Sequence, residues 1–252
     1  MLLIAAALQE ELNVALALFR GPKQLRHRGV EFWQSARGGP TVRFLRTGVG
    51  PKRAAASLER ALGVLDVSRI LVVGYAGALD PRLKLGTLVL VEKALACSLD
   101  TSDPAVESMK LDRAFVLAPD DSLAAAAVRT RLAVHSGDTL TSAHVWGNPE
   151  HKRILREKFG ASVVDMETAA LAGVAQNNGI PLSCARVISD EAEDSFLEPF
   201  AYDPSSGISE RAGKMFRKGN PVKTYREWKR NASAARLILN ELLQGYLPLI
   251  PE

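Results

Sequence analysis

Short apolar runs alternate along this chain with segments of helical periodicity, and that alternation constrains the fold most. The apolar runs occupy residues 2–8, 41–47, 70–74, 87–91, 133–136, 161–164 and 182–188. Consecutive apolar positions over so short a length are typical of strands buried on both faces. Such strands, separated by helices, predict an α/β fold whose sheet is covered on both sides.

Helical patterns fill most of the intervals between these runs. They are predicted at residues 10–19, 51–63, 122–132, 149–159, 166–178 and 228–243. Pro51 suits a first helical turn, and Gly179 with Pro181 ends the helix before the last strand. Residues 100–121 and 196–224 are expected to be irregular, and the second segment is a candidate lid. Without a repeat or linker, we expect one domain spanning residues 1–252.

Charge and composition exclude several classes of protein. The chain has 252 residues, 47% of them hydrophobic and 24% charged, which suits a globular domain with a full core. The net charge is +4, but the charges are dispersed, so we expect no nucleic-acid partner. The basic segment at residues 214–230 reads first as a solvated surface, with an anion or partner patch as the weaker reading.

Cysteine and histidine usage indicates neither disulfides nor a metal. Cys97 and Cys184 are far apart and belong to no motif, so we expect reduced thiols in a cytoplasmic protein. The four histidines form no metal-binding pattern. The apolar start of the chain lacks a basic leader, and acids follow it at once, so a buried strand is expected there. No apolar run is long enough for a membrane span.

Polar residues collect where the predicted strands end. These positions are Glu10 and Glu11, the Gly48–Gly50 turn, the stretches 74–78 and 137–141, Asp165 with Glu167, and Asp190. Taken singly, glycine turns and acids at helix starts have plain explanations. In an α/β sheet, however, ligands bind beyond the carboxyl ends of the strands. The recurrence of polar strand ends therefore predicts that these clusters converge on one cleft.

The stretch "VVDMETAALAG" at residues 163–173 leaves two readings open. Asp165 could cap the following helix, and Glu167 could complement the positive end of its dipole. Alternatively, Glu167 reaches into a site. Arg186 lies inside an otherwise apolar strand, and a buried arginine without a partner is costly, so we expect a partner for it.

Six segments, in order, resemble the nucleoside phosphorylase/nucleosidase superfamily. They are "AALQEEL", "TGVGPKRAA", "GYAGALDPRLKLGTLVL", "SGDTLT", "VVDMETAALA" and "ARVISDEAE", which span residues 5 to 194. Within the superfamily the chain is most similar to the methylthioadenosine/S-adenosylhomocysteine nucleosidases. The resemblance implies a single-domain, three-layer α/β/α fold with a central mixed, mostly parallel sheet. It also implies an enzyme without a cofactor that cleaves the N-glycosidic bond of a purine nucleoside, as a homo-oligomer of two or more subunits.

The resemblance also implies three catalytic residues. Asp190 aligns with the acid that protonates or hydrogen-bonds N7 of the purine, and the acids after it could raise its pKa. Glu11 aligns with the acid that activates the attacking water, although Glu10 is one residue away and the register could be off by one. Arg186 aligns with an arginine that helps to hold the water.

Substrate-binding positions follow from the same resemblance. Glu167 aligns with the glutamate that accepts hydrogen bonds from the ribose hydroxyls, and Met166 aligns with the methionine beneath the sugar. Leu140 takes the place of an aromatic that stacks on the purine, and Thr141 follows it. The remaining expected substrate contacts are Val164, Tyr75, Ala76 and Gly77. Asp165 is expected to act only as a cap.

The chain departs from the family pattern at Tyr75, which replaces a small hydroxyl residue. In phosphorolytic members that hydroxyl contacts phosphate with the help of an arginine, and no arginine stands in the expected places here. We therefore expect hydrolysis, with a phosphorylase as the alternative. In that case the cations would come from Arg43, Arg46, Lys52 and Arg53, or from a neighbouring subunit.

Substrate identity stays open at this point. A purine nucleoside with a bulky 5′ group is plausible, and residues 196–224 would then help to form its pocket. A non-catalytic nucleoside-binding protein is a further reading, because a fold does not fix a function. A Rossmann-type cofactor enzyme is disfavoured, because "GVGPKR" lacks the full glycine fingerprint.

Overall fold

The computed structural model describes residues 1–19, 21–35, 41–99, 105–195, 200–201 and 221–250. A sheet of ten strands forms its centre, in the order β10-β8-β6-β11-β5-β1-β4-β3-β2, with β7 paired to β6. The strands are β1 (Leu2–Ala6), β2 (Lys23–His27), β3 (Val30–Gln34), β4 (Val42–Arg46), β5 (Arg69–Ala78), β6 (Leu88–Ser98), β7 (Lys110–Val116), β8 (Val134–Thr141), β10 (Val163–Asp165) and β11 (Leu182–Asp190). Two short strands, β9 (His144–Val145) and β12 (Phe200–Ala201), pair separately.

The pairing is mixed, as the sequence predicted. Parallel ladders join β4, β1, β5 and β11, and also β6 to β8, while β2, β3 and β7 pair antiparallel with their neighbours. Strand β10 pairs parallel with β8 and antiparallel with β5. This double pairing curls one half of the sheet and brings the ends of β5, β8 and β10 together.

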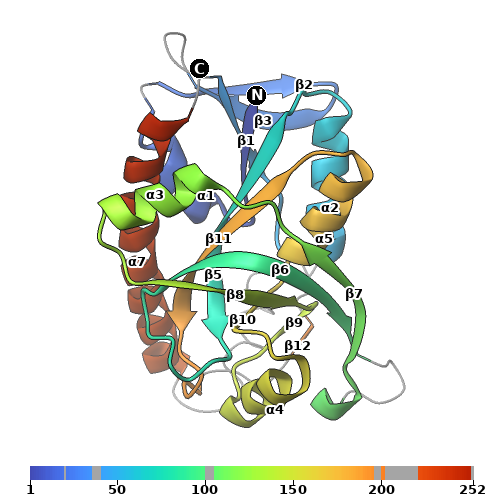
Figure 1. Cartoon of the computed structure of the whole chain (residues 1–252), viewed down its shortest axis with the longest axis vertical. Helices are drawn as coiled ribbons and strands as arrows, with labels where there is room; N and C mark the ends of the chain where they lie inside the picture. The colour runs from blue at the N-terminus through green and yellow to red at the C-terminus, as the bar shows by residue number, and fades with distance from the viewer. Residues whose placement is uncertain (20, 36–40, 100–104, 196–199, 202–220, 251–252) are drawn as a thin grey trace.

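Helices cover both faces of the sheet (Figure 1). They are α1 (Gln9–Leu16), α2 (Pro51–Leu62), α3 (Asp121–Arg129), α4 (Pro149–Phe159), α5 (Thr168–Asn177) and α7 (Pro221–Tyr246), with 3-10 turns at Val106–Ser108 and Leu247–Leu249. One core cluster joins α2 and α5 to the sheet, and a second joins α1, α3 and α7 to its other face. The predicted three-layer α/β/α architecture is therefore confirmed. Helix α4 lies across one end of the sheet, next to β9 and β10 (Figure 1).

Local sequence accounts for the elements that surround this end. Every residue of β1 is buried, as expected for a strand covered on both faces. Helix α4 begins where the Asn148 side chain accepts a hydrogen bond from the Glu150 backbone N–H, and it ends at Gly160, whose φ is 69°. The alanine-rich helix α5 is buried along most of its length, so its small side chains allow it to pack closely on the sheet.

Three sequence expectations are corrected by the structure. Residues 74–78 were expected in a loop, but they continue β5, because this edge of β5 is paired on both sides by β11 and β10. The stretch 137–141 likewise belongs to β8. Residues 100–121 were expected to be irregular, yet they contain β7, which pairs with β6 and carries few buried residues.

The candidate lid at residues 196–224 lies mostly outside the described residues. Within it, Phe200–Ala201 pairs with β9, and α7 begins at Pro221. Among the helices that the structure describes, none is long and apolar enough to cross a membrane.

Candidate active site

A cavity of about 180 Å³ lies at the carboxyl ends of β1, β5, β10 and β11. This is the edge of an α/β sheet where ligands are expected. Eight of the eleven sequence-predicted site residues line it: Glu11, Tyr75, Ala76, Gly77, Val164, Met166, Glu167 and Asp190. The expected convergence of polar strand ends is therefore found in the structure, except for the stretch 137–141, which does not line this cavity.

Three predicted residues do not line this cavity. Leu140 is fully buried in a small core cluster that also holds Trp146, so the structure does not place it as a stacking surface. Thr141 turns its hydroxyl to Asp165, donating a hydrogen bond of 2.6 Å to Oδ1. Arg186, 1% exposed, lies behind the cavity wall and acts on the site through the side chains that it contacts.

Glu11 is buried and lines the cavity, whereas Glu10 is exposed, so the geometry favours Glu11 over Glu10 as the site residue. Glu11 is the third residue of α1, and its Oε2 accepts a hydrogen bond of 2.8 Å from the backbone N–H of Leu8. Its Oε1 accepts one of 3.0 Å from the backbone N–H of Tyr75. Burial raises the pKa of Glu11, against the opposing effect of Arg186. The carboxyl group is thus fixed at both oxygens and holds a proton more readily than an exposed glutamate.

Glu167 stands at the start of α5 and crosses to the glycine turn after β4. Its Oε1 accepts a hydrogen bond of 2.9 Å from the backbone N–H of Gly50, and its Oε2 lies 3.7 Å from Nη2 of Arg186. Burial raises the pKa of Glu167 to about 8; Arg186 opposes this rise and Asp165 adds to it. Between the two readings of "VVDMETAALAG", the geometry favours a side chain that reaches the cavity.

Asp165 pairs with Arg186 and also caps α5. Its Oδ2 lies 3.0 Å from Nη2 of Arg186, and the side chains of both residues are 1% exposed. Its Oδ1 accepts hydrogen bonds from the backbone N–H groups of Glu167 and Thr168, and the Thr168 hydroxyl donates to Oδ2. The expected cap and the expected partner of the buried arginine are therefore one carboxylate, which lies in the cavity wall.

Gly74 makes room for two of these side chains. A Cβ at this position would lie 2.6 Å from Nη1 of Arg186 and 2.6 Å from Oε1 of Glu11. The two side chains therefore converge on the backbone of β5 just before Tyr75. Burial, followed by the charges of Glu11 and Glu10, raises the pKa of the Tyr75 phenol, which keeps it neutral.

Asp190 is the last residue of β11, directly after a β-bulge. The register of β11 against β5 shifts between Ile188 and Asp190, so Ser189 is the extra residue. The Ser189 hydroxyl donates a hydrogen bond of 3.0 Å to Oδ1 of Asp190. On the other oxygen, Nζ of Lys152 lies 2.6 Å from Oδ2.

The acids that follow Asp190 do not surround it, contrary to the sequence expectation. The Glu191 carboxylate pairs with Lys84 at 2.8 Å and accepts a hydrogen bond from the backbone N–H of Leu85. Asp194 accepts a hydrogen bond from the backbone N–H of Glu191, and Glu193 is exposed. The charged neighbour of Asp190 is therefore a lysine.

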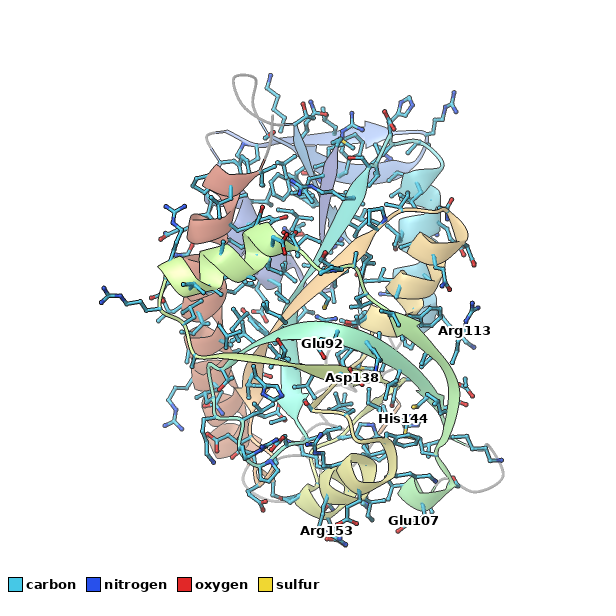
Figure 2. The ribbon with its side chains drawn as sticks, viewed as in Figure 1. Glu92, Glu107, Arg113, Asp138, His144 and Arg153 are labelled. Carbon is cyan, nitrogen blue, oxygen red and sulfur yellow. The ribbon has the colours of Figure 1, made fainter. Side chains whose placement is uncertain are left out.

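Sequence reasoning missed Lys152 and the β9 segment. His144, Val145 and Trp146 line the cavity, and Trp146 is an aromatic residue in its wall, which Leu140 does not line. Figure 2 shows His144, the first residue of β9, above α4 in this view. The signal for Lys152 lies in its spacing, because it shares with Leu155 the inner face of α4, where a charged side chain needs a buried partner.

A second, larger groove of about 860 Å³ adjoins the cavity, and Val49 and His144 line both. Two of the four phosphate-binding candidates, Lys52 and Arg53, line this groove instead of the cavity. The Arg43 guanidinium stacks on Phe32 and donates to Gln34.

Arg46, the remaining candidate, is exposed at the end of β4 and reaches Gln9. Among the described residues that line the cavity, none is a lysine or an arginine. The part of the chain that the structure describes also holds no group of three His, Cys, Asp or Glu side chains placed to bind a metal ion.

The structure has a mixed sheet between helical layers and an acidic cavity at the carboxyl ends of its strands. These features define the class of α/β proteins that bind a small molecule at this place. Comparison with known proteins narrows this class. Residues 2–216 match the phosphorylase superfamily, and the chain belongs to that family. The family resemblance predicted from the sequence is confirmed, and with it the expectation of an enzyme of this superfamily.

Two relatives are 5′-methylthioadenosine/S-adenosylhomocysteine nucleosidases. That of Glaesserella parasuis serovar 5 is 25% identical over 222 residues, covering 81% of this chain and 94% of the relative. That of a Marinomonas species is 26% identical over 206 residues, covering 77% of this chain and 89% of the relative.

Solved structures share the fold. The futalosine hydrolase of Helicobacter pylori superposes with a TM-score of 0.72 at 19% identity, covering 96% of this chain and 97% of that structure. The 5′-methylthioadenosine/S-adenosylhomocysteine nucleosidase of Neisseria meningitidis, in complex with methylthio-immucillin-A, gives 0.73 at 17% identity and 99% coverage of both chains.

Proposed function

We propose that this protein cleaves the N-glycosidic bond of a purine nucleoside by hydrolysis. One observation carries the proposal: Glu11, Glu167 and Asp190 line a single cavity whose described lining contains no lysine or arginine. Three carboxyl groups could contact the purine, the ribose hydroxyls and an attacking water, one group for each. A phosphate ion beside the sugar would need cations or oriented N–H donors, as phosphorolysis requires.

Asp190 acts on the purine. As the bond between C1′ and N9 breaks, its electron pair moves to the base, and N7 gains a proton. Asp190 stabilises this proton by a hydrogen bond, and such assistance contributes roughly 10²–10⁴-fold to a rate. Trp146, 3% exposed, lies in the same wall and offers an apolar surface for the purine ring.

Glu11 acts on the water. The backbone N–H groups of Leu8 and Tyr75 hold its two oxygens, so the carboxylate has a fixed direction. As the new bond from the water oxygen to C1′ forms, the carboxylate accepts the proton that the water loses. The raised pKa of Glu11 makes it a stronger base than an exposed glutamate.

Glu167 and Met166 hold the ribose between these two groups. Both line the cavity, and Glu167 is anchored to Gly50. Its carboxyl accepts hydrogen bonds from the sugar hydroxyls, which fixes C1′ between base and water. Arg186 holds Asp165 and lies close to Glu167, so it orients the binding carboxyl from behind.

The substrate carries an apolar 5′ substituent in this proposal. The larger groove begins at Val49 and His144, where the cavity ends, and its wall includes Phe115, Ala169 and Val174. The relatives support a nucleoside of this kind, because their names specify 5′-methylthioadenosine and S-adenosylhomocysteine as their substrates.

The test is the release of free base, measured by chromatography, from a panel of purine nucleosides. The panel holds adenosine, inosine, methylthioadenosine and larger 5′-substituted nucleosides, each incubated without phosphate and with added phosphate. Release without phosphate, with free sugar as the second product, supports hydrolysis. Release only with phosphate indicates a phosphorylase, and the search for its anion site then starts at Lys52 and Arg53. Binding of a nucleoside, seen as a rise in melting temperature without release, indicates a non-catalytic binding protein.

A further inference from the structure

The most deeply buried cation beside the cavity is Lys152, which the proposed reaction does not use. Its side chain is 0% exposed, and its Nζ lies 2.6 Å from Oδ2 of Asp190 and 2.7 Å from the backbone oxygen of Glu191. Asp190, at 14% side-chain exposure, faces the cavity. The ammonium group therefore contacts the base-side carboxyl from the interior of the protein.

The stability of the fold does not explain this pair. Removing two charges from water costs several kcal/mol for each ion, and apolar replacements of buried ion pairs are often neutral or stabilising. A methionine at position 152 would satisfy the inner face of α4, as Leu155 does one turn later. The lysine instead fixes the position and the charge of one carboxylate at the cavity wall.

We infer that Lys152 is a positioning residue for Asp190, an inference that rests on the proposed function. Lys152 holds Oδ2 and Ser189 holds Oδ1, so the plane of the carboxylate is set before a substrate enters. The proton that N7 gains as the bond breaks comes from solvent, Glu11 returns to solvent the proton that it took from the attacking water, and Asp190 accepts a hydrogen bond from N7–H.

The other charged groups near Asp190 leave this role to Lys152. Glu191, on the same turn, directs its carboxylate to Lys84. The cavity wall contains further titratable groups on other elements, namely Glu11 from α1, Tyr75 from β5, His144 from β9, and Asp165 and Glu167 at the end of β10. No positive charge in that group is joined to Asp190 by an ion pair, whereas Lys152 from α4 is.

Helix α4 also offers a matched control at the next residue. Arg153 is 55% exposed and pairs with Glu150 and Glu157 on the outer side of the helix. Figure 2 shows it at the outer edge of α4, away from the sheet. Arg153→Met removes one cation from the same helix without touching the site.

The experiment compares Lys152→Met and Arg153→Met in the wild-type and the Asp190→Asn backgrounds. Base release from methylthioadenosine gives kcat and KM, and thermal unfolding reports the fold. We expect Lys152→Met to lower kcat roughly tenfold to a hundredfold with little change in KM, as expected when a reacting group is misplaced. In the Asp190→Asn background the same change should have no further effect, because residues that act as a unit are not additive. In both backgrounds, Arg153→Met should have the same kcat and KM as the protein without this substitution.

The separation of kcat from KM gives a readout that a purely structural lysine would not move. A lysine that only supports the fold would change the melting temperature, whereas loss of the contact with Asp190 should lower kcat at nearly constant KM. Lys152→Gln keeps an N–H donor but removes the charge, and it replaces Lys152→Met if that protein fails to fold.

Two results would overturn the inference: an equal loss of kcat in both backgrounds, or an unchanged kcat in Lys152→Met. A fully active Asp190→Asn protein would instead overturn the proposed role of Asp190. An inactive Asp190→Asn protein beside a fully active Lys152→Met protein would remove only the role of Lys152.

Discussion

The carboxyl group of Asp190 occupies the space that a side chain at Gly77 would need. The two residues are register partners on β11 and β5, and a Cβ at position 77 would lie 2.7 Å from Oδ2 of Asp190. A side chain at 77 and the observed position of Asp190 therefore exclude each other. The glycine is required by the close approach of a neighbouring strand, not by a turn.

Gly77→Ala should consequently displace Asp190 from its two hydrogen-bond donors. We expect kcat for base release to fall by up to about 100-fold, since a displacement near 1 Å at a reacting group has effects of that size. Gly63→Ala, at the end of α2, is the control, because its Cβ would meet no atom closer than 3.5 Å. Equal activity of the two variants would contradict the proposed importance of the Asp190 position.

Asp190→Asn tests the base-side carboxyl directly. The amide keeps the size of the side chain but loses its charge, so kcat should fall roughly 10²–10⁴-fold. The protein should still fold, but its melting temperature should fall, because Asn leaves the buried Lys152 ammonium without an anionic partner. Steady-state kinetics with circular dichroism measures both, and near-wild-type turnover would remove Asp190 as the base-side group.

Glu11→Gln and Glu10→Gln form a matched pair in the first turn of α1. Glu11 is buried at the cavity, and Glu10 is exposed. If Glu11 activates the water, only Glu11→Gln should lose activity, by roughly 10²–10⁴-fold. Turnover of both proteins in phosphate-free buffer decides the point, and a greater loss in Glu10→Gln would show that the assignment is off by one residue.

Glu167 should make the stability of the empty protein depend on pH. Its pKa of about 8 lies above the ordinary value of 4.5, so the folded state binds this proton more tightly than the unfolded chain. The contribution of Glu167 to the free energy of unfolding should therefore be complete below about pH 4.5, and it should decrease as the pH rises from about 4.5 to about 8. Glu167→Gln should flatten this fall, measured by urea denaturation across that range. A slope identical to that of the wild type would contradict the raised pKa.

Above about pH 8, where Glu167 is ionised, Glu167→Gln should also weaken substrate binding, because a neutral amide replaces a carboxylate acceptor for the ribose hydroxyls. Binding of a nucleoside, followed by calorimetry, should weaken on the scale of a charged hydrogen bond, roughly 1.5–3 kcal/mol. Unchanged affinity would show that the residue does not hold the sugar.

The sheet and its helical layers could be predicted from the sequence because burial on both faces gives uninterrupted apolar runs. Strand β1 and helix α4 illustrate this, and α4 was predicted with the bounds that it has. Strand β7 could not be found in this way, since only Phe115 of its seven residues is buried. The extension of β5 beyond Gly74 was hidden for a different reason: its glycines suggest a turn, whereas they admit side chains from α1 and β11.

Within the site, residues that belong to sequence motifs could be predicted, whereas residues that reach the cavity only through tertiary packing could not. Glu11, Glu167 and Asp190 follow strands, so the topology of the sheet brings them together. Trp146 directly follows β9 and Lys152 lies in α4, and no local sequence pattern shows that these two side chains reach the cavity and Asp190. Leu140 was expected to contact the purine, but it does not line the cavity, because its side chain packs into a core cluster.

The bulge at Ser189 determines which changes β11 can accept. Side chains alternate along a strand, so one residue more or fewer before Asp190 would turn it to the opposite face of the sheet. Substitutions at 189 leave this count unchanged, whereas a single-residue deletion there reverses the direction of Asp190 and separates it from both Gly77 and Lys152. Across divergent relatives of this chain, the number of residues in β11 up to Asp190 should therefore be preserved.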